Sequence, residues 1–424
     1  MAVKSASIEN NVLVMEISIP LENAMLEGEA SIEKALNEAG VAASRELLKR
    51  FDTEGGALQV GSVKFTSKGQ TEKIYHTPYG DTRINRHVYQ SPKGGPTFCP
   101  LDDSARIINS ATPKLAKMLS HKYSKLSVDE VKTDLQSNRG LSLSRGYIQN
   151  VSERVGSVAQ AKEEQWHYST PQVDAPVATV GLGLDGTTLH LREQGYRETM
   201  VGTLVLYDAM GARLHTTYIG ASPEYGKSTF IQRMEREIKH VKTLYPNALY
   251  IGVADGAADN WPFLERHTSK QVTDFWHATE YLADAAEAIF PTKKAHDKKK
   301  EWLDDRCHKL KHLKGAAGRI LKELKQQAKN IRSKVRLEKL HKAIRYFTNQ
   351  KSRMNYYALI NQALPIGSGV TEAACKMIVK QRLCQSGMKW SENGASIILS
   401  LRTLERSNRW EQFWGKINQY GVAY

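Results

Sequence analysis

The sequence predicts a multidomain α/β protein, and two observations lead to this fold class. Short apolar runs such as residues 177–184 and 248–254 are bounded by Pro, Asn or Gly, which is typical of buried strands. Residues 277–362 instead show helical character nearly throughout. With 424 residues, of which 41% are hydrophobic, the chain can bury more than one core, so two to four domains are expected.

The first hundred residues predict a helix followed by strands. Residues 25–51 place apolar side chains among polar ones and end at an Asp-Thr-Glu-Gly-Gly stop. This helix forms an N-terminal arm (residues 1–56) that either dimerises or packs on its own chain. Residues 57–102 alternate short strands with Gly-containing breaks and predict a small β unit. Its polar residues fit DNA contacts and a solvated hairpin equally well: Arg83, Arg86, His87 and Tyr89.

Residues 103–170 predict a helix-turn-helix DNA-binding domain. Ser127 and Glu130 have capping-box spacing at the start of one helix, residues 139–142 form a Gly-containing turn, and residues 143–155 form a second helix. In DNA-binding proteins the second helix enters the major groove. The same two-helix pattern also occurs in proteins that never bind DNA. The candidate base contacts are Ser142, Ser144, Arg145, Gln149 and Asn150, and the candidate phosphate contacts are Arg139 and Arg154.

Three acids far apart in the chain predict a metal site. Asp185 and Asp255 are each the first charge after a predicted buried strand, and Glu372 follows Gly-Ser-Gly-Val-Thr near the start of a helix. A carboxylate at the end of a buried strand, without a cationic neighbour in sequence, is costly unless a metal ion balances it. Alone, each Asp is typical of a turn and Glu372 of a first helical turn. Together, the order Asp, Asp, Glu predicts the two-metal site of a ribonuclease-H-like core, which cuts and joins phosphodiesters.

Residues 171–290 are expected to form the first part of this core. The strand ending at Asp185 is followed by strands over 200–208 and 213–219, a helix over 223–244, and a strand over 248–254. A short helix over 260–266 and a fifth strand over 271–275 complete it. Asp185 and Asp255 then lie on adjacent parallel strands, close enough to share ions about 3.5 to 4 Å apart.

Residues 365–424 form the second part of the core and carry Glu372. At helical spacing, Glu372 lies on the same side as Lys376 and Lys380, whose charges suit the phosphates of a bound nucleic acid. The further candidate DNA contacts extending this surface are Arg382, Lys389 and Trp390.

The net charge of +15 is confined to one segment. Residues 291–353 contain 21 Lys and Arg against 6 Asp and Glu, and the rest of the chain contains 39 of each sign. This excess lies between the second and third acids, so residues 291–364 are interpreted as a basic all-helical insertion that closes over DNA. A merely solvated surface is the alternative.

The compartment is predicted from the cysteines and the hydropathy. Cys99, Cys307, Cys375 and Cys384 form no CxxC pair, which argues against zinc fingers and a disulfide scaffold. The N-terminus lacks a secretory pattern, and no apolar run approaches the ~20 residues that span a bilayer. We therefore expect a cytoplasmic, nucleoid-associated protein that does not enter a membrane.

Two motifs carry a family resemblance. Asp274-Phe275-Trp276-His277 with residues 278–282, and residues 367–376 through Ser386-Gly387-Met388-Lys389-Trp390, resemble the bacterial insertion-sequence DDE transposases of the Kra group. That group is similar to the Mutator-like branch, whose Asp/Cys-x-x-His signature fits Asp274 and His277. The resemblance spans roughly residues 100–410. It implies that Asp185, Asp255 and Glu372 are the DDE triad and that His277 contacts a phosphate or leaving group, unless His277 is only a structural cap.

The resemblance implies a DDE transposase. Two Mg²⁺ ions, with Mn²⁺ as a substitute, are expected on Asp185, Asp255 and Glu372, with Asp185 bridging. The expected partners are double-stranded DNA, as terminal inverted repeats and target, and further copies of the chain in a homodimer or higher oligomer. Two alternatives stay open: a ribonuclease-H-like nuclease or resolvase that does not join strands, and a non-catalytic helix-turn-helix regulator.

Overall fold

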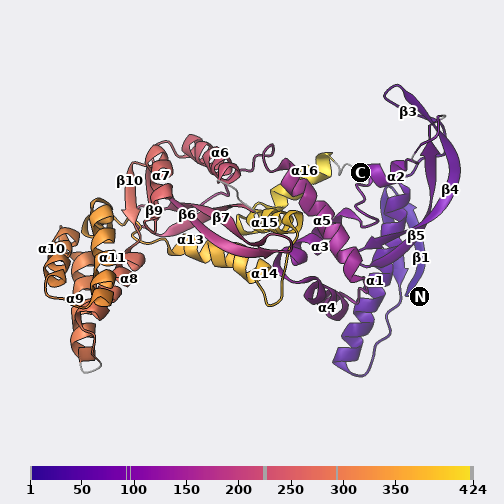
Figure 1. Cartoon of the computed structure of the whole chain (residues 1–424). Coiled ribbons are helices and arrows are strands. Elements are labelled where there is room, and N and C mark those ends of the chain that lie inside the picture. Colours follow the sequence, from indigo (N-terminus) through magenta and orange to yellow (C-terminus); the bar gives the residue numbers. More distant parts are fainter. Residues whose placement is uncertain (1, 92, 96, 223–226, 293–294, 421–424) are drawn as a thin grey trace. The chain divides into compact units, whose positions relative to one another are not determined.

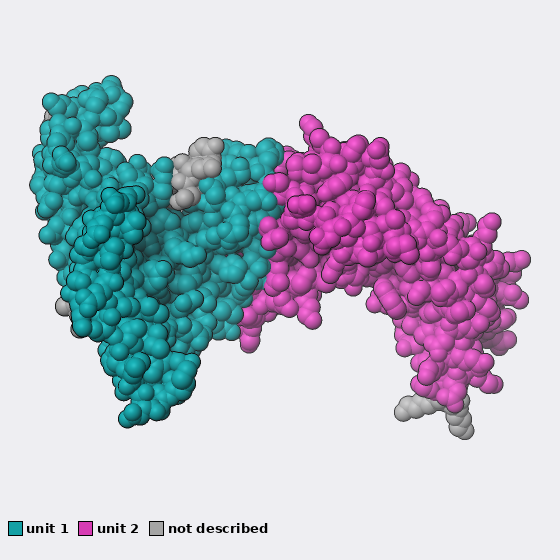
Figure 2. All heavy atoms as spheres, turned by 180° about the vertical axis from the view of Figure 1, so that it is seen from behind, with its two compact units in different colours: residues 1–168, 400–405, 409–424 teal, residues 169–399, 406–408 magenta. Residues whose placement is uncertain are grey.

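The computed structural model describes residues 2–91, 93–95, 97–222, 227–292 and 295–420 (Figure 1). The protein is mixed α/β, as predicted, with several helices and three sheets among these residues. It divides into two compact units: unit 1 comprises residues 1–168, 400–405 and 409–424, and unit 2 comprises residues 169–399 and 406–408 (Figure 2). Within the described ranges, no helix combines the length and the apolar character needed to cross a membrane.

Unit 1 begins with β structure around one long helix. Strands β1 (Val3–Glu9) and β2 (Val12–Ile17) form an antiparallel hairpin that the sequence patterns did not predict. Helix α1 (Met25–Lys49) follows, as expected. Strands β3 (Leu58–Val60), β4 (Val63–Thr77) and β5 (Gly80–Gln90) then form the predicted small β unit, an antiparallel sheet.

The helical part of unit 1 contains α2 (Pro100–Ser104), α3 (Pro113–Lys125), α4 (Val128–Arg139), α5 (Arg145–Lys162) and α16 (Trp410–Tyr420). The predicted capping box at the start of α4 is confirmed, because the Ser127 side chain accepts from the Glu130 N–H and the Glu130 carboxylate accepts from the Ser127 N–H. Gly140 ends α4 in the left-handed conformation with φ of 60°, and Ser144 caps α5. Helix, turn and helix therefore follow one another as predicted.

Unit 2 is built on one five-stranded sheet in the order β10-β9-β6-β7-β8. Strands β6 (Thr179–Leu191), β7 (Gly195–Tyr207) and β8 (Arg213–Ala221) are antiparallel to one another, and β9 (Leu249–Ala254) and β10 (Lys270–Thr273) run parallel to β6. The predicted adjacency of the first and fourth strands is confirmed. The predicted strand end at Asp185 is wrong, because β6 continues for six residues beyond it along β7.

Helices cover both faces of this sheet. Helices α6 (Ser228–Leu244) and α7 (Trp261–His267), the latter after the short η1 (Ala258–Asn260), pack on one face with alternate residues of the strands, including Leu182, Leu204 and Tyr250. The first residues of the predicted helix over 223–244, residues 223–226, lie outside the described residues. On the other face, α13 (Gly369–Ala374) lies against β6 and β7, and Leu399 of α15 (Glu392–Arg406) lies against Gly220 of β8.

The seat of α13 depends on a glycine in β6. A Cβ added at Gly183 would collide with Thr371 Oγ1 of α13 and would lie 2.9 Å from Thr203 Oγ1 of β7. Both hydroxyls are buried, and they are hydrogen-bonded to each other at 2.7 Å. A bare backbone at residue 183 therefore lets the helix that carries Glu372 approach the sheet closely.

A helical layer in unit 2 begins with α8 (Phe275–Ile289), which precedes the predicted insertion over residues 291–364. The described residues of that segment are helical as expected and form α9 (His296–His312), α10 (Ala316–Ala328), α11 (Lys334–Gln350), η3 (Lys351–Arg353) and α12 (Tyr356–Ile360). Their apolar side chains share one core with Ile251 and Val253 of β9, so the helices are packed directly onto the sheet.

Replacing Gly183 by Ala is expected to push α13 off the sheet. We expect the free energy of unfolding of unit 2 to fall by about 1 to 3 kcal/mol, which is typical of overpacking. Gly369→Ala in the same helix is the matched control, because a Cβ at Gly369 would meet no atom within 4 Å. Urea unfolding followed by tryptophan fluorescence measures both variants. Equal stability of the two would contradict the close seat of α13.

Candidate active site

Three aspartates lie at the same level of the sheet. The pairing of β6 with β9 joins each residue to the one 70 positions later, from Thr179 with Leu249 to Gly183 with Val253. Asp185 and Asp255 are also 70 positions apart. The pairing of β9 with β10 has an offset of 19, and Asp274 lies 19 positions after Asp255. Because neighbouring strands lie about 4.8 Å apart, this register brings the three acids to one level just past the end of the parallel pairing, where β9 and β10 end and β6 continues along β7.

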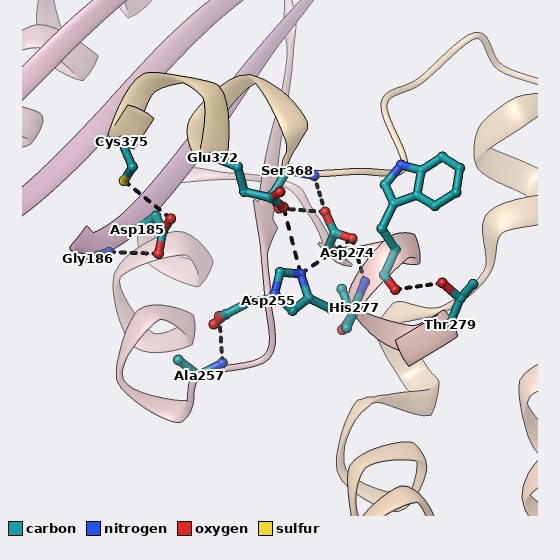
Figure 3. A network of polar contacts seen from close by, with 12 residues as sticks. Asp185, Gly186, Asp255, Ala257, Asp274, His277, Thr279, Ser368, Glu372 and Cys375 are labelled. Carbon is teal, nitrogen blue, oxygen red and sulfur yellow. Dashed lines mark hydrogen bonds and ion pairs between the residues drawn. The ribbon is translucent and has the colours of Figure 1, made fainter. Parts of the chain in front are cut away.

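The pKa of Asp185 shows the influence of the two other predicted triad acids. Its Oδ2 accepts from the Cys375 thiol at 3.3 Å, and its Oδ1 accepts from the Gly186 N–H at 2.8 Å (Figure 3). Burial raises the pKa of Asp185, these hydrogen bonds oppose the rise, and the charges of Asp255 and Glu372 raise the pKa further. Asp255 and Glu372 therefore act on Asp185 through their negative charges, and a bound divalent cation would offset these charges.

The helical insertion holds the Asp255 loop. The Tyr346 hydroxyl of α11 donates to the Asp255 carbonyl at 2.7 Å, and the Gln350 amide donates to the Gly256 carbonyl at 3.0 Å. Gly256 has φ of 110°, a conformation that favours glycine, and a Cβ there would lie 2.9 Å from the Tyr346 ring. Among the described residues, the Asp255 side chain accepts one hydrogen bond, from the Ala257 N–H at 2.9 Å, and it remains partly exposed.

Asp274 joins α8 to the start of α13. Its carboxylate is fully buried, caps α8 by accepting from the His277 N–H at 2.9 Å, and accepts from both the N–H and the hydroxyl of Ser368. Burial acts to raise the pKa of Asp274, but the hydrogen bonds from His277 and Ser368 outweigh it and lower the pKa to about 2. Asp274 is thus an ionised anchor for the turn that precedes Glu372.

Glu372 points toward this anchor. Its Oε1 lies 2.7 Å from the hydroxyl oxygen of Ser368, whose single proton is shared between Glu372 and Asp274, and 3.8 Å from Nδ1 of His277 (Figure 3). The hydrogen bond to Asp274 raises the pKa of His277 to about 9, against the opposing effect of burial. His277 is therefore a cation at neutral pH, held between two carboxylates.

Two sets of side chains at this site are possible metal ligands. One consists of Asp274, His277 and Glu372, and the other of Asp185, Asp255 and Glu372. Ligand atoms of Asp274, His277 and Glu372 lie within 4.8 Å of one another. In this group the Asp274 oxygens already accept hydrogen bonds from Ser368 and His277. Among the described residues, Asp185 and Asp255 join no group of three ligands within that distance. The carboxylates of Asp255 and Glu372 nevertheless act on Asp185 through their charges, since both raise its pKa after burial does. Their chemistry fits hard divalent cations such as Mg²⁺ and Mn²⁺.

The predicted DNA contacts after Glu372 divide into two groups. Lys376, Lys380 and Lys389 are exposed. Arg382 differs from the prediction, because only 2% of it is exposed and its guanidinium lies over the Trp390 ring at 5.1 Å. Trp390 is also committed internally, since its indole N–H donates to the Leu383 carbonyl at 2.9 Å.

The physical reason for this difference is a change of helix type. After α13 the chain forms the π-helix η4 (Cys375–Lys380) and then the short α14 (Gln381–Leu383). A π-helix takes more residues per turn than an α-helix, so residues beyond it leave the face that regular spacing predicts.

The predicted contacts in unit 1 lie on or beside α5. Arg154 is partly buried, whereas the other six are exposed: Arg139, Ser142, Ser144, Arg145, Gln149 and Asn150. Three of them are engaged locally. Ser144 caps α5, Arg145 Nε pairs with Asp129 at 3.1 Å, and the Gln149 amide donates to Glu153 at 2.8 Å.

Several supporting residues were not predicted as part of the site. Asp274 had the same signal as the other two aspartates, an acid directly after a buried strand, but was read only as part of a motif. Tyr346 and Gln350 carry no sequence signal, and Ser368 and Cys375 lie in the motif over residues 367–376 without a role assigned there, because these roles depend on contacts across 77 to 190 residues.

Comparison of the sequence with models of known protein families found no match, and comparison with curated proteins found none either. The chemistry of the site is therefore argued from its own geometry.

The ion pair of Asp274 and His277 predicts how stability depends on pH in chelator-treated, metal-free buffer. The raised pKa of His277 stabilises the fold fully below about 6.5, and this contribution is lost as the pH rises through about 9. The lowered pKa of Asp274 stabilises the fold above about 3.8, and its contribution is lost as the pH falls through about 2.

We expect His277→Asn to be destabilised relative to wild type below pH 6.5 and to approach wild-type stability above pH 9. Urea unfolding of both proteins between pH 5 and 10 measures this difference. A difference that stays constant across the range would show that His277 is not held as a cation by Asp274.

Proposed function

We propose that the protein is a DDE transposase of a bacterial insertion sequence. The observation that carries the proposal is the common level of Asp185 and Asp255 on parallel strands, with Glu372 presented by the helix seated on the same strand as Asp185. Three carboxylates in one local field, beside a cationic His277, suit a reaction that moves negatively charged phosphodiesters on divalent cations.

The sheet supports a ribonuclease-H-like core. Three antiparallel strands are followed by helix α6, which leads to β9 on the other side of β6, and β10 adds outside β9. The acids then sit on the first and fourth strands and on a later helix, which is the order expected for such a core. The helical layer inserted between Asp255 and Glu372 agrees with the same proposal.

In this proposal Asp185, Asp255 and Glu372 would hold two Mg²⁺ ions, for which Mn²⁺ could substitute. Bound ions of this kind activate water or a 3′ hydroxyl and stabilise the leaving oxygen. The residues of the chain supply the rest. Cationic His277 attracts the phosphate near Glu372, Asp274 and Ser368 hold the start of α13, and Lys376 and Lys380 offset phosphate charge.

DNA binding is assigned to two surfaces, one in each unit. In unit 1, the exposed residues at the start of α5 are proposed to read the terminal inverted repeats, with copies of the chain assembling on paired ends. In unit 2, α10 buries Ala316, Ile320 and Leu324 and turns the opposite side outward. That exposed side carries Arg319, Lys322, Lys325 and Lys329, and no ion pair joins these four to an acid in the described part of the chain.

The proposal is tested on labelled DNA that carries the ends of the chain's own element, together with a target plasmid. We expect Mg²⁺- or Mn²⁺-dependent end cleavage and joined products from the wild type. Asp255→Asn and Glu372→Gln should lower both by at least about 10²-fold, because each removes charge stabilisation at the reacting phosphate.

Asp259→Asn is the matched control, since Asp259 is an exposed acid four residues after Asp255. It should keep wild-type activity. Cleavage without joined products would indicate a nuclease, and DNA binding without any metal-dependent cleavage by the wild type would indicate a regulator.

The basic side of α10 predicts a change in salt dependence. Each lost phosphate contact lowers the slope of log K against log[salt] by about 0.9, so Lys322→Gln, Lys325→Gln and Lys329→Gln together should lower it by about 2.7. The control combines Lys309→Gln and Lys339→Gln, whose ammonium groups are 2.8 Å from Asp305 and Glu287. Fluorescence anisotropy over a salt series measures both. An unchanged slope in the triple variant would leave α10 as a solvated surface.

A further inference from the structure

The contact between Cys375 and Asp185 is not explained by a metal site of three carboxylates alone. Cys375 follows α13 directly, begins the π-helix η4, and is buried with 5% of its surface exposed. Its Sγ lies 3.3 Å from Oδ2 of Asp185, although 190 positions separate the two residues. Figure 3 shows the thiol pointing at this carboxylate from the helix that also carries Glu372.

The direction of this hydrogen bond follows from chemistry. An ionised carboxylate can only accept, so the thiol must donate. The geometry agrees, because the Cys375 Sγ is placed as donor to the Asp185 Oδ2. Cys375 is therefore a donor to Asp185 rather than a competing anion.

The helix gives Cys375 and Glu372 related positions. Residues three apart on a helix lie on neighbouring parts of one face. Glu372 reaches Ser368 and His277, whereas Cys375 reaches Asp185. Thr371 of α13 packs over Gly183 of β6, and Gly183 lies two residues before Asp185. One helix thus delivers a metal-binding carboxylate and a donor to a second one.

Both oxygens of Asp185 are consequently fixed. Oδ1 accepts from the Gly186 N–H at 2.8 Å and Oδ2 accepts from Cys375. A carboxylate held by donors on both oxygens has little freedom about its final side-chain bond. Ligands held in this way lose less conformational entropy when an ion binds, which is how residues behind a metal ligand tune affinity.

We propose that Cys375 is a positioning residue, whose thiol holds Asp185 in the orientation that receives the divalent cations. The inference rests on the proposed function, because it assumes that Asp185 is a metal ligand. It adds a residue that acts through Asp185 and that neither the three-acid pattern nor the Asp-x-x-His motif contains.

Substitutions at residue 375 separate donation from packing. Cys375→Ser keeps a donor, Cys375→Val keeps the volume without a donor, and Cys375→Ala removes both. Cys384→Ala is the matched control, because Cys384 is exposed and its Sγ contacts a backbone oxygen, that of Thr188, at 3.6 Å. The primary readout is Mn²⁺ affinity in the absence of DNA, from the free-ion signal in electron paramagnetic resonance.

We expect Cys375→Val and Cys375→Ala to bind Mn²⁺ about 10-fold more weakly than the wild type, at the low end for such residues because a thiol is a weak donor. Cys375→Ser should stay within about 3-fold of the wild type, and Cys384→Ala should be unchanged. The Mg²⁺ concentration for half-maximal DNA cleavage should shift in the same order. Circular dichroism identifies any variant that fails to fold, and the isosteric Val variant keeps the test valid if Ala does.

Three results would overturn the inference. Wild-type affinity in folded Cys375→Val would show that the donor is irrelevant. A Ser variant as weak as Ala would show that residue 375 acts by packing alone. In both cases the proposed function would stand, whereas a wild type that binds no Mn²⁺ would remove the metal site and the inference together.

Discussion

The site depends on the repulsion among Asp185, Asp255 and Glu372. Parallel register brings the two aspartates to one level, and the close seat of α13 brings Glu372 to the same region. Burial raises the pKa of Asp185, and the charges of Asp255 and Glu372 raise it further, so the arrangement is unfavourable for the fold by itself. Proteins keep such clusters where a bound cation turns repulsion into affinity, so the cost in stability and the capacity to bind metal have one origin.

Two buried connections hold the repelling groups in place. Hydrogen bonds from Ser368 and His277 stabilise the buried charge of Asp274. These bonds also join the end of β10 to the beginning of α13. Tyr346 and Gln350 do the equivalent for the Asp255 loop through its backbone carbonyls. Because Tyr346 and Gln350 donate to backbone carbonyls, the oxygens of the Asp255 carboxylate stay available to a metal ion. A direct hydrogen bond to those oxygens would occupy them.

The strands and the acids were accessible from sequence because a buried strand of a parallel pair is apolar on both faces, so the first charge after it stands out. The extension of β6 beyond Asp185 was missed for the same reason. Beyond Gly183 the strand has lost β9 as a partner, its residues alternate between buried and exposed, and the apolar signal ends although pairing with β7 continues. The β1–β2 hairpin was not predicted, and its strands are largely exposed, including the apolar side chains of Ile8, Val12 and Val14.

The predicted DNA contact at Arg382 was wrong for a different reason. Arg382 was expected to extend the surface formed by Lys376 and Lys380, whereas it follows the π-helix η4, which changes the helical phase, and is buried against Trp390. Backbone hydrogen-bond register of this kind has no local residue signature. The π-helix begins at Cys375, so Glu372 and Cys375 keep the regular three-residue spacing of α13, and the residues after Cys375 take the change of phase. The irregularity therefore alters the position of Arg382 while the side chains that reach His277 and Asp185 stay on neighbouring parts of one face.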